Sequence, residues 1–317
     1  MWLLLACSGT PTDEPTVETS TVTILSGRDE QFATALIALV EARHPELEIV
    51  TDFGKDAGYL DRVSAWNGQP KADLFLSKSS GTMESLAEAG LAAPLDAALT
   101  ARVPERYRGE DWVGLSVRAR VLVTRDDLDD PPTAVADLAD PRFEGRVART
   151  VATNGSFVGG VSTLVAEQGE DEARAFLEAL DRNSVGNVHP KHTPAVAAVA
   201  EGAADVALVN HYYFYRSEAD NLVITYPDPV AWNVTGGAIL AGAPNPEGAR
   251  KVLEVLLSDE GQAAYAHTNS EYPAVEGAPP PPGVTPPSEF TWSTTSLSAL
   301  AEAQPVAVRL IQEVGLE

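Results

Sequence analysis

The sequence predicts an α/β protein built from two lobes. From Thr21 onward, short runs rich in β-branched residues alternate with stretches that have helical periodicity. A second unit of the same kind follows the long apolar run 112–124. The chain of 317 residues also exceeds the roughly 250–300 residues at which one hydrophobic core stops growing. With 44% apolar residues it can bury a large core, which excludes a disordered or collagen-like chain.

The first unit alternates strands and helices. Strands are predicted at 22–26, 48–53 and 73–76, and helices at 31–43, 57–65 and 82–89, the last ended by Gly90. The first helix has one apolar face, formed by Phe32, Ala35, Leu36, Leu39 and Val40. The β-α-β-α-β order predicts a parallel sheet with helices on both faces.

The second unit and the C-terminal part continue the pattern. Strands are predicted at 147–152, 206–209 and 236–240, and helices at 156–167, 170–183, 194–201, 246–257, 259–266 and 296–314. The segment 278–287 is rich in proline and is predicted to be neither helix nor central strand. No internal repeat is visible.

The composition is strongly acidic. Lysine and arginine number 22 against 46 aspartate and glutamate residues, so the formal net charge is -24. Such a chain does not release counterions from nucleic acid, so nucleic acid is excluded as a partner. The acidity favours solubility and, more weakly, a cationic ligand.

The N-terminus contains the one cysteine of the chain, Cys7. Residues 1–7 are too few to span a bilayer, which needs about 20 residues. The tetrad Leu4-Leu5-Ala6-Cys7 resembles the bacterial lipobox and predicts a lipid anchor at Cys7; the alternative is a chance cysteine. Because the basic region before such a signal is missing, we expect the gene start to lie upstream. Residues 1–20 are then a signal remnant and flexible tether, and no disulfide forms.

Enzyme motifs are missing from the sequence. The first strand is followed by Ser26-Gly27-Arg28-Asp29-Glu30, without a dinucleotide fingerprint. There is also no phosphate loop, nucleophile elbow or zinc-protease motif, so we expect no catalytic activity. His189 and His192 make a zinc site conceivable, but prolines at 190 and 194 place the pair in a loop, where surface histidines are the commoner interpretation.

Several segments together carry a family resemblance. In 208–215 a predicted strand ends at Asn210 and is followed by Tyr212 and Tyr213; the other segments are 26–28, 72–75, 112–121, 137–146, 271–273 and 311–315. In this order the chain resembles the periplasmic ferric-iron-binding proteins, the transferrin-like solute-binding components of Fe³⁺ ABC importers. The resemblance runs from about residue 21 to the C-terminus.

The resemblance implies a two-lobed periplasmic binding protein fold of type II. Each lobe would be a mixed sheet flanked by helices, and two crossing hinge strands would let the lobes close on iron. By analogy one lobe holds 21–117 plus 233–275, and the other holds 118–232 plus 276–317. It also implies a monomeric, membrane-anchored protein outside the cytoplasm that delivers iron to an ABC permease in the inner membrane.

The predicted metal ligands are Tyr212, Tyr213 and Asp29. Ferric iron is a hard acid that prefers anionic oxygen, and phenolate provides it once the metal displaces a proton. The alternative for the tyrosines is aromatic packing at a hinge, which is the role expected for Tyr215. Asp29 stands where many family members carry histidine, and its carboxylate is a hard ligand.

A synergistic anion (carbonate, phosphate or citrate) is implied beside the iron. The loop with Asn154, Gly155 and Ser156 begins a helix, whose free N–H groups and dipole favour an anion; the alternative is a plain helix cap. Asn210 and His192 correspond to polar residues of the same region in the family.

One departure from the family pattern is Lys78. It replaces an oxygen ligand, usually glutamate, and an ammonium group cannot bind iron. The predicted site is therefore anion-dependent, unless Lys78 is a solvated surface residue. Lys78 and Arg28 also support a rival function, a binding protein for a phosphonate or carboxylate that has lost the iron site. Tyr59 is expected to pack in the core.

Overall fold

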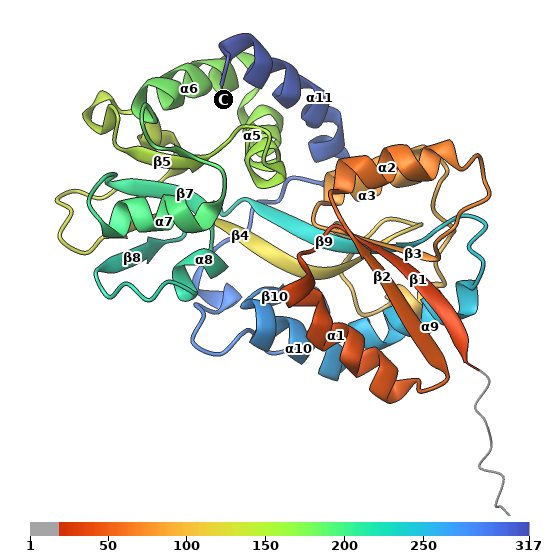
Figure 1. Ribbon diagram of the computed structural model, residues 1–317. Helices are drawn as coiled ribbons and strands as arrows, with labels where there is room; N and C mark the ends of the chain where they lie inside the picture. The colour runs from red at the N-terminus through yellow and green to blue at the C-terminus, as the bar shows by residue number, and fades with distance from the viewer. Residues whose placement is uncertain (1–18, 317) are drawn as a thin grey trace, which may run out of the picture.

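The computed structural model describes residues 19–316 and shows two lobes (Figure 1). The predicted lipidation site at Cys7 and most of the predicted tether lie outside these residues. Within them, no helix combines the length and the apolar character that a membrane span requires.

The first lobe contains the first three strands. These are β1 (Ser20–Ser26), β2 (Leu47–Phe53) and β3 (Leu74–Ser77), alternating with α1 (Glu30–Arg43), α2 (Asp56–Ala65) and α3 (Ser80–Glu88). β1 pairs in parallel with both β2 and β3, as the sequence predicts. Strand β9 (Trp232–Ile239) returns antiparallel to β3, so the sheet of this lobe is mixed, as the family resemblance implies. Helices α9 (Pro246–Leu257) and α10 (Asp259–Asn269) pack with α1 on the other face (Figure 1).

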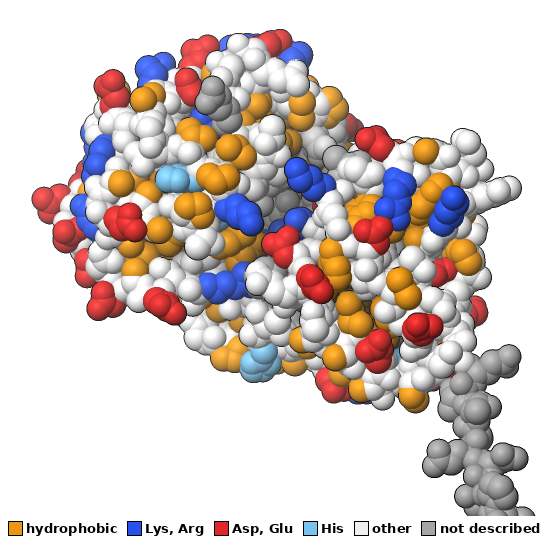
Figure 2. All heavy atoms as spheres, viewed as in Figure 1, with side chains coloured by type: hydrophobic (Ala, Val, Ile, Leu, Met, Phe, Trp, Pro, Cys, Tyr) orange, Lys and Arg blue, Asp and Glu red, His pale blue; other side chains and the backbone are white. Residues whose placement is uncertain are grey.

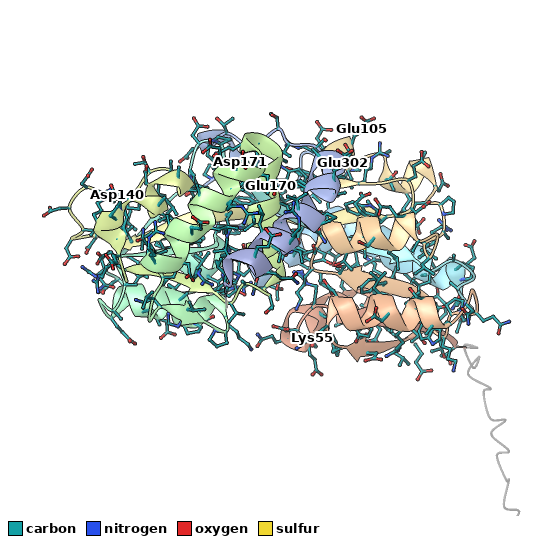
Figure 3. All side chains as sticks on the ribbon, turned by 90° about the horizontal axis from the view of Figure 1, so that it is seen from above. Lys55, Glu105, Asp140, Glu170, Asp171 and Glu302 are labelled. Atoms are coloured by element: carbon teal, nitrogen blue, oxygen red, sulfur yellow. The ribbon has the colours of Figure 1, made fainter. Side chains whose placement is uncertain are left out.

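The second lobe repeats the layered arrangement. Its strands are β5 (Val147–Thr150), β6 (Val188–His189), β7 (Val206–Asn210) and β8 (Leu222–Thr225), and its helices are α5 (Gly155–Gln168), α6 (Glu170–Asn183), α7 (His192–Ala200), α8 (Tyr212–Tyr215) and α11 (Leu297–Val314). A separate apolar core, which includes Phe143, Leu177 and Leu310, lies in this lobe. Glu170, labelled in Figure 3, pairs with Arg309 and thereby links α6 to α11.

Strand β4 (Val113–Arg125) joins the two lobes. Its first half pairs with β9 and with the short β10 (Tyr272–Pro273), and its second half pairs with β7 and β8. The sheet order is β2-β1-β3-β9-β4-β7-β5-β6, with β8 and β10 also on β4. Strands β4 and β9 are therefore the two crossing strands, and the predicted fold class is confirmed. The lobe boundaries predicted by residue number stay a prediction.

Short elements complete the chain. They are α4 (Ala97–Thr100), β10 and four 3₁₀ turns at Glu105–Tyr107, Val135–Ala139, Pro141–Phe143 and Pro287–Glu289. Residues 278–286 form no helix or strand, as their prolines predict. The predicted bounds of α6 and α9 are correct, whereas β9 begins four residues earlier than predicted.

Gly114 lies where β4 passes under the turn at Tyr107. A Cβ at this position would lie 2.4 Å from the Tyr107 carbonyl oxygen and 2.8 Å from Val234 Cγ1. We expect Gly114→Ala to lower the free energy of unfolding by about 1–3 kcal/mol, because a backbone oxygen must move. Urea denaturation measures the change. Gly160→Ala is the control: nothing lies within 4 Å in α5, so this variant should gain up to about 1 kcal/mol of stability. A loss of stability at both glycines would contradict the steric explanation.

Candidate metal and anion site

A cleft of about 710 Å³ lies between the lobes. Figure 2 shows it as a hollow with lysine and arginine side chains around its rim. The N-terminal ends of α2, α3, α5 and α7 are among the parts of the chain that line it. Its charged and phenolic lining consists of Arg28, Asp29, Lys55, Asp56, Lys78, Glu84, Arg118, Lys191, His192, Tyr212, Tyr213, Arg216 and Glu271. Lys55 precedes α2 at the edge of the first lobe (Figure 3).

Tyr212 and Tyr213 lie side by side in the cleft. Strand β7 ends at Asn210, and α8 begins two residues later with the tyrosine pair. The ring centroids are 4.4 Å apart. Burial, reinforced by the neighbouring Tyr212, raises the pKa of Tyr213 above its ordinary value of 10. Tyr213 therefore stays a neutral phenol at pH 7 until a cation displaces its proton.

His211 fixes the start of α8. Its Nδ1 accepts a hydrogen bond from the Ala119 N–H at 3.1 Å, and its Nε2–H donates to the Ser270 carbonyl at 2.9 Å. The ring also stacks on Tyr272, 4.5 Å away. Because both partners lie on other elements, His211 holds the tyrosine pair against β4 and the segment before β10.

Two buried arginines stand behind the tyrosines. Arg118 and Arg120 share one face of β4, and the Nε and Nη2 atoms of both have no hydrogen-bond partner. Burial lowers the pKa of Arg120 to about 10, although the tyrosines oppose this effect. Arg216 lies 4.5 Å above the Tyr212 ring and donates a hydrogen bond to the Asn269 carbonyl. The unused donors of Arg118, a buried cationic side chain that lines the cleft, favour an anion nearby.

Sequence reasoning missed Arg118 and Arg120 as site residues. A signal was present, because two arginines two residues apart in an otherwise apolar strand must face the same side. The sequence could not show that Arg118 lines the cleft or that Arg120 donates to Asn210 beside it.

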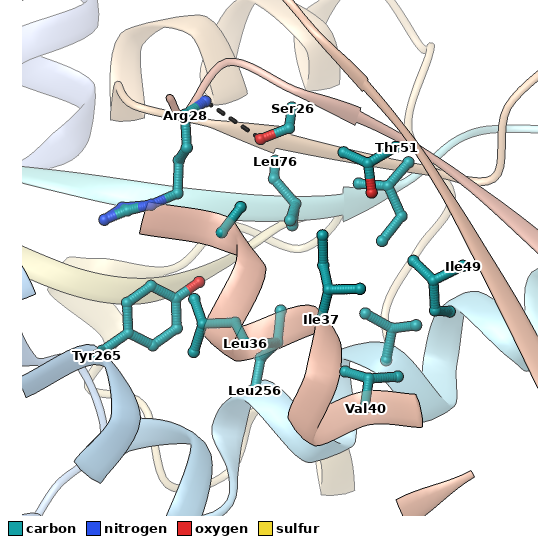
Figure 4. A pocket seen from close by; sticks show the side chains of 13 residues that line it. Ser26, Arg28, Leu36, Ile37, Val40, Ile49, Thr51, Leu76, Leu256 and Tyr265 are labelled. Carbon is teal, nitrogen blue, oxygen red and sulfur yellow. Dashed lines mark hydrogen bonds between the residues drawn. The ribbon is translucent and has the colours of Figure 1, made fainter. Parts of the chain in front are cut away.

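Arg28 is engaged in a buried ion pair with Glu271. Its Nη2 lies 2.6 Å from Glu271 Oε2, and Ser116 Oγ donates to the same oxygen. Burial would raise the pKa of Glu271, but Arg28 and Arg118 outweigh it and leave this pKa lowered. Behind Arg28 lies a small apolar cavity of about 20 Å³ beside Tyr265 and Leu36 (Figure 4). It belongs to the core of the first lobe.

The predicted anion loop is joined to the tyrosine pair by Asn210. Asn154 caps α5 by accepting from the Ser156 N–H at 2.9 Å. Asn210 Nδ2 donates to Ser156 Oγ at 3.1 Å and to Tyr212 Oη at 3.3 Å. The structure therefore brings the loop, Asn210 and the tyrosines together, as the predicted site requires. Asn210 itself lies behind the cleft wall.

Asp29 and Lys78 lie at the rim of the cleft. Their side chains are 65% and 44% exposed, and Lys78 Nζ is 3.8 Å from Asp29 Oδ1. Each is thus the partner of the other.

Tyr59 and Tyr215 pack as predicted: the Tyr59 hydroxyl donates to the Asp52 carbonyl, and the Tyr215 hydroxyl pairs with Thr285 Oγ1. Over residues 19–316, no three His, Cys, Asp or Glu side chains are grouped to hold a metal, so the conceivable zinc site finds no support.

Comparisons with known proteins fit this geometry. Residues 69–294 match the family described as bacterial extracellular solute-binding protein. Iron uptake protein A1 from Synechocystis is 30% identical over 336 aligned positions, which cover 99% of this chain and 93% of that protein. The major ferric iron-binding protein of Neisseria gonorrhoeae is 26% identical and covers 93% of each chain.

The chain belongs to this family of bacterial extracellular solute-binding proteins.

Solved structures of family members share its fold. Iron-bound HitA from Pseudomonas aeruginosa superposes with a TM-score of 0.86 at 28% identity, covering 93% of this chain and 99% of that chain. The Trichodesmium protein in complex with iron and citrate gives a TM-score of 0.82 at 25% identity, covering 94% and 100%. The family is one of transport components and not of enzymes.

The buried pair Arg28–Glu271 predicts a pH-dependent stability. Because the pKa of Glu271 is lowered on folding, its contribution is present above the ordinary value near 4.5 and is lost as pH falls through the folded value. We expect Glu271→Gln to lower the free energy of unfolding by about 3–5 kcal/mol at pH 7, since Arg28 loses its partner. Urea denaturation at several pH values should show this difference shrinking below about pH 4.5. A difference that is constant with pH would contradict the ion-pair assignment.

Proposed function

We propose that this protein captures Fe³⁺, together with a synergistic anion, in the cleft and delivers it to an ABC permease. The observation that carries the proposal is the adjacent pair Tyr212 and Tyr213 in a cleft between two lobes, with Arg118 unpartnered behind it. Family members that bind ferric iron or take part in iron uptake support it.

The tyrosines provide the hard ligands. Binding of Fe³⁺ replaces the two phenol protons, and the phenolates then bind the metal directly. Asp29 at the rim of the first lobe adds a carboxylate when the lobes close. Two phenolates and one carboxylate balance the three charges of the ion.

The anion completes the site and pairs with the buried guanidinium of Arg118. An unsatisfied buried donor costs about 1–3 kcal/mol, and more when it is charged, so an anion that accepts from it stabilises the closed form. At the start of α5 the N–H group of Gly155 supplies a further donor. The N–H groups of Asn154 and Ser156 are hydrogen-bonded within the loop. Carbonate, phosphate and citrate all have the required oxygen atoms, and a Trichodesmium relative was solved with iron and citrate. Lys78 adds a screened charge at the rim.

The surroundings of the protein are also part of the proposal. We infer a monomer outside the cytoplasm, anchored by lipid at Cys7, with a permease of the inner membrane as partner. The lobes would be 21–117 plus 233–275 and 118–232 plus 276–317, since β4 and β9 cross between them.

A rival function, binding of a small phosphonate or carboxylate without iron, is favoured by the unpartnered Arg118. The sequence supported this rival with Lys78 and Arg28. The structure removes Arg28 from that argument, because its guanidinium is paired with Glu271. A colourless protein after loading with ferric citrate, stabilised by a phosphonate, would favour the rival.

The double variant Tyr212→Phe/Tyr213→Phe tests the iron ligands. We expect the wild-type protein to show a visible phenolate-to-iron charge-transfer band and the variant to show none, because only the two hydroxyls are lost. The affinity for iron should fall by more than roughly 10- to 100-fold, which is the loss typical when a residue that only hydrogen-bonds to a metal ligand is replaced. Tyr215→Phe is the control and should keep the band. Unchanged iron affinity in the double variant would disprove the assignment.

Arg118→Gln tests the anion. We expect iron dissociation to become about 10- to 100-fold less sensitive to added carbonate, phosphate or citrate, because the buried positive charge of the guanidinium is removed. Lys78→Gln and Lys78→Glu remove or reverse a charge at the exposed rim, where solvent screens it, and should reduce the sensitivity less. Equal sensitivity in wild type and Arg118→Gln would show that the anion binds elsewhere.

A further inference from the structure

His192 is buried in the cleft wall without a hydrogen-bond partner. It is the first residue of α7, and its exposure is 3%. Among the histidines of residues 19–316, only His192 has both ring nitrogens buried and without a hydrogen-bond partner. His211, by contrast, has both nitrogens satisfied by backbone groups.

The neighbours of His192 do not explain this arrangement. A neutral imidazole carries one N–H donor and one lone pair, and leaving both without a partner in the interior destabilises the folded protein. The adjacent charges belong to Arg118 and Arg120, which supply only donors and make no hydrogen bond to the ring. Both ring nitrogens thus keep a binding capacity that no residue of 19–316 uses.

The ring also has a defined relation to the predicted iron ligands. Its centroid lies 4.7 Å from the centroid of Tyr213, with 31° between the ring planes. The two tilted rings are neighbours in the cleft wall, and this proximity is what ligation of one ion by both side chains requires. Imidazole is a good ligand for iron as well as for copper and zinc.

We propose that His192 donates a ring nitrogen to the iron held by Tyr212 and Tyr213. The second lobe then offers three ligands on α7 and α8 before the cleft closes, and Asp29 and the anion add theirs afterwards. This inference rests on the proposed function. It gives His192 a different role from the anion contact that the sequence predicted, since Arg118 and Gly155 at the start of α5 already provide the anion with donors.

Electron spin-echo spectroscopy of the Fe³⁺-loaded, full-length protein tests the assignment. The protein is prepared with natural histidine and with ¹⁵N-histidine. We expect a nitrogen coupling that changes with the histidine label, which excludes arginine and backbone nitrogen. The coupling should be lost in His192→Gln and retained in His189→Gln. His189 is the matched control because it lies three residues away, in β6, and does not line the cleft.

The outcomes are distinct. A charge-transfer band without a label-dependent coupling in the wild type overturns the role of His192 and leaves the proposed function standing. A coupling that survives in His192→Gln also overturns it, as does phosphorus coupling from phosphate without histidine nitrogen coupling. If no band forms at all, the proposed function itself fails. Circular dichroism checks folding, and His192→Asn serves as a second variant if glutamine disturbs α7.

Discussion

Strand β4 is the constraint on which the cleft depends. Its thirteen residues pair with β9 and β10 in one half and with β7 and β8 in the other. Because side chains alternate along a strand, one register places Ser116, Arg118 and Arg120 on a single face. The same register lets Ala119 hold His211, and so fixes the tyrosine pair on α8. A shift by one residue would remove both the arginines and the tyrosines from the site.

Charge is distributed unevenly in this acidic protein. The chain as a whole carries -24, yet six basic and four acidic side chains line the cleft in the described part of the chain. Two of the opposite charges, Arg28 and Glu271, neutralise each other in the interior. Arg118 and Arg216 lie beside the phenols of Tyr212 and Tyr213. Such a site opposes a bare cation and favours a cation that arrives with anionic oxygen, which is the physical reason for a synergistic anion.

Sequence patterns predicted the elements well where the pattern was local. The periodicity of α6 and α9 and the β-α-β order of the first lobe were sufficient. The antiparallel return of β9 was not predictable from that order, because it depends on pairing across about 160 residues with β3. In the site, Tyr212, Tyr213 and the α5 loop followed from residue types and resemblance. The ion-pair partners of Arg28 and Lys78 were not predictable. Glu271 is distant from Arg28 in the sequence. Asp29, the partner of Lys78, is an exposed side chain.

The most direct test of the central claim is to locate the metal itself. Crystals of the protein grown with ferric citrate would be measured on both sides of the iron absorption edge. We expect one anomalous peak in the cleft, within bonding distance of the Tyr212 and Tyr213 hydroxyl oxygens. A peak elsewhere, or ordered anion density in the cleft with no anomalous signal, would contradict the account.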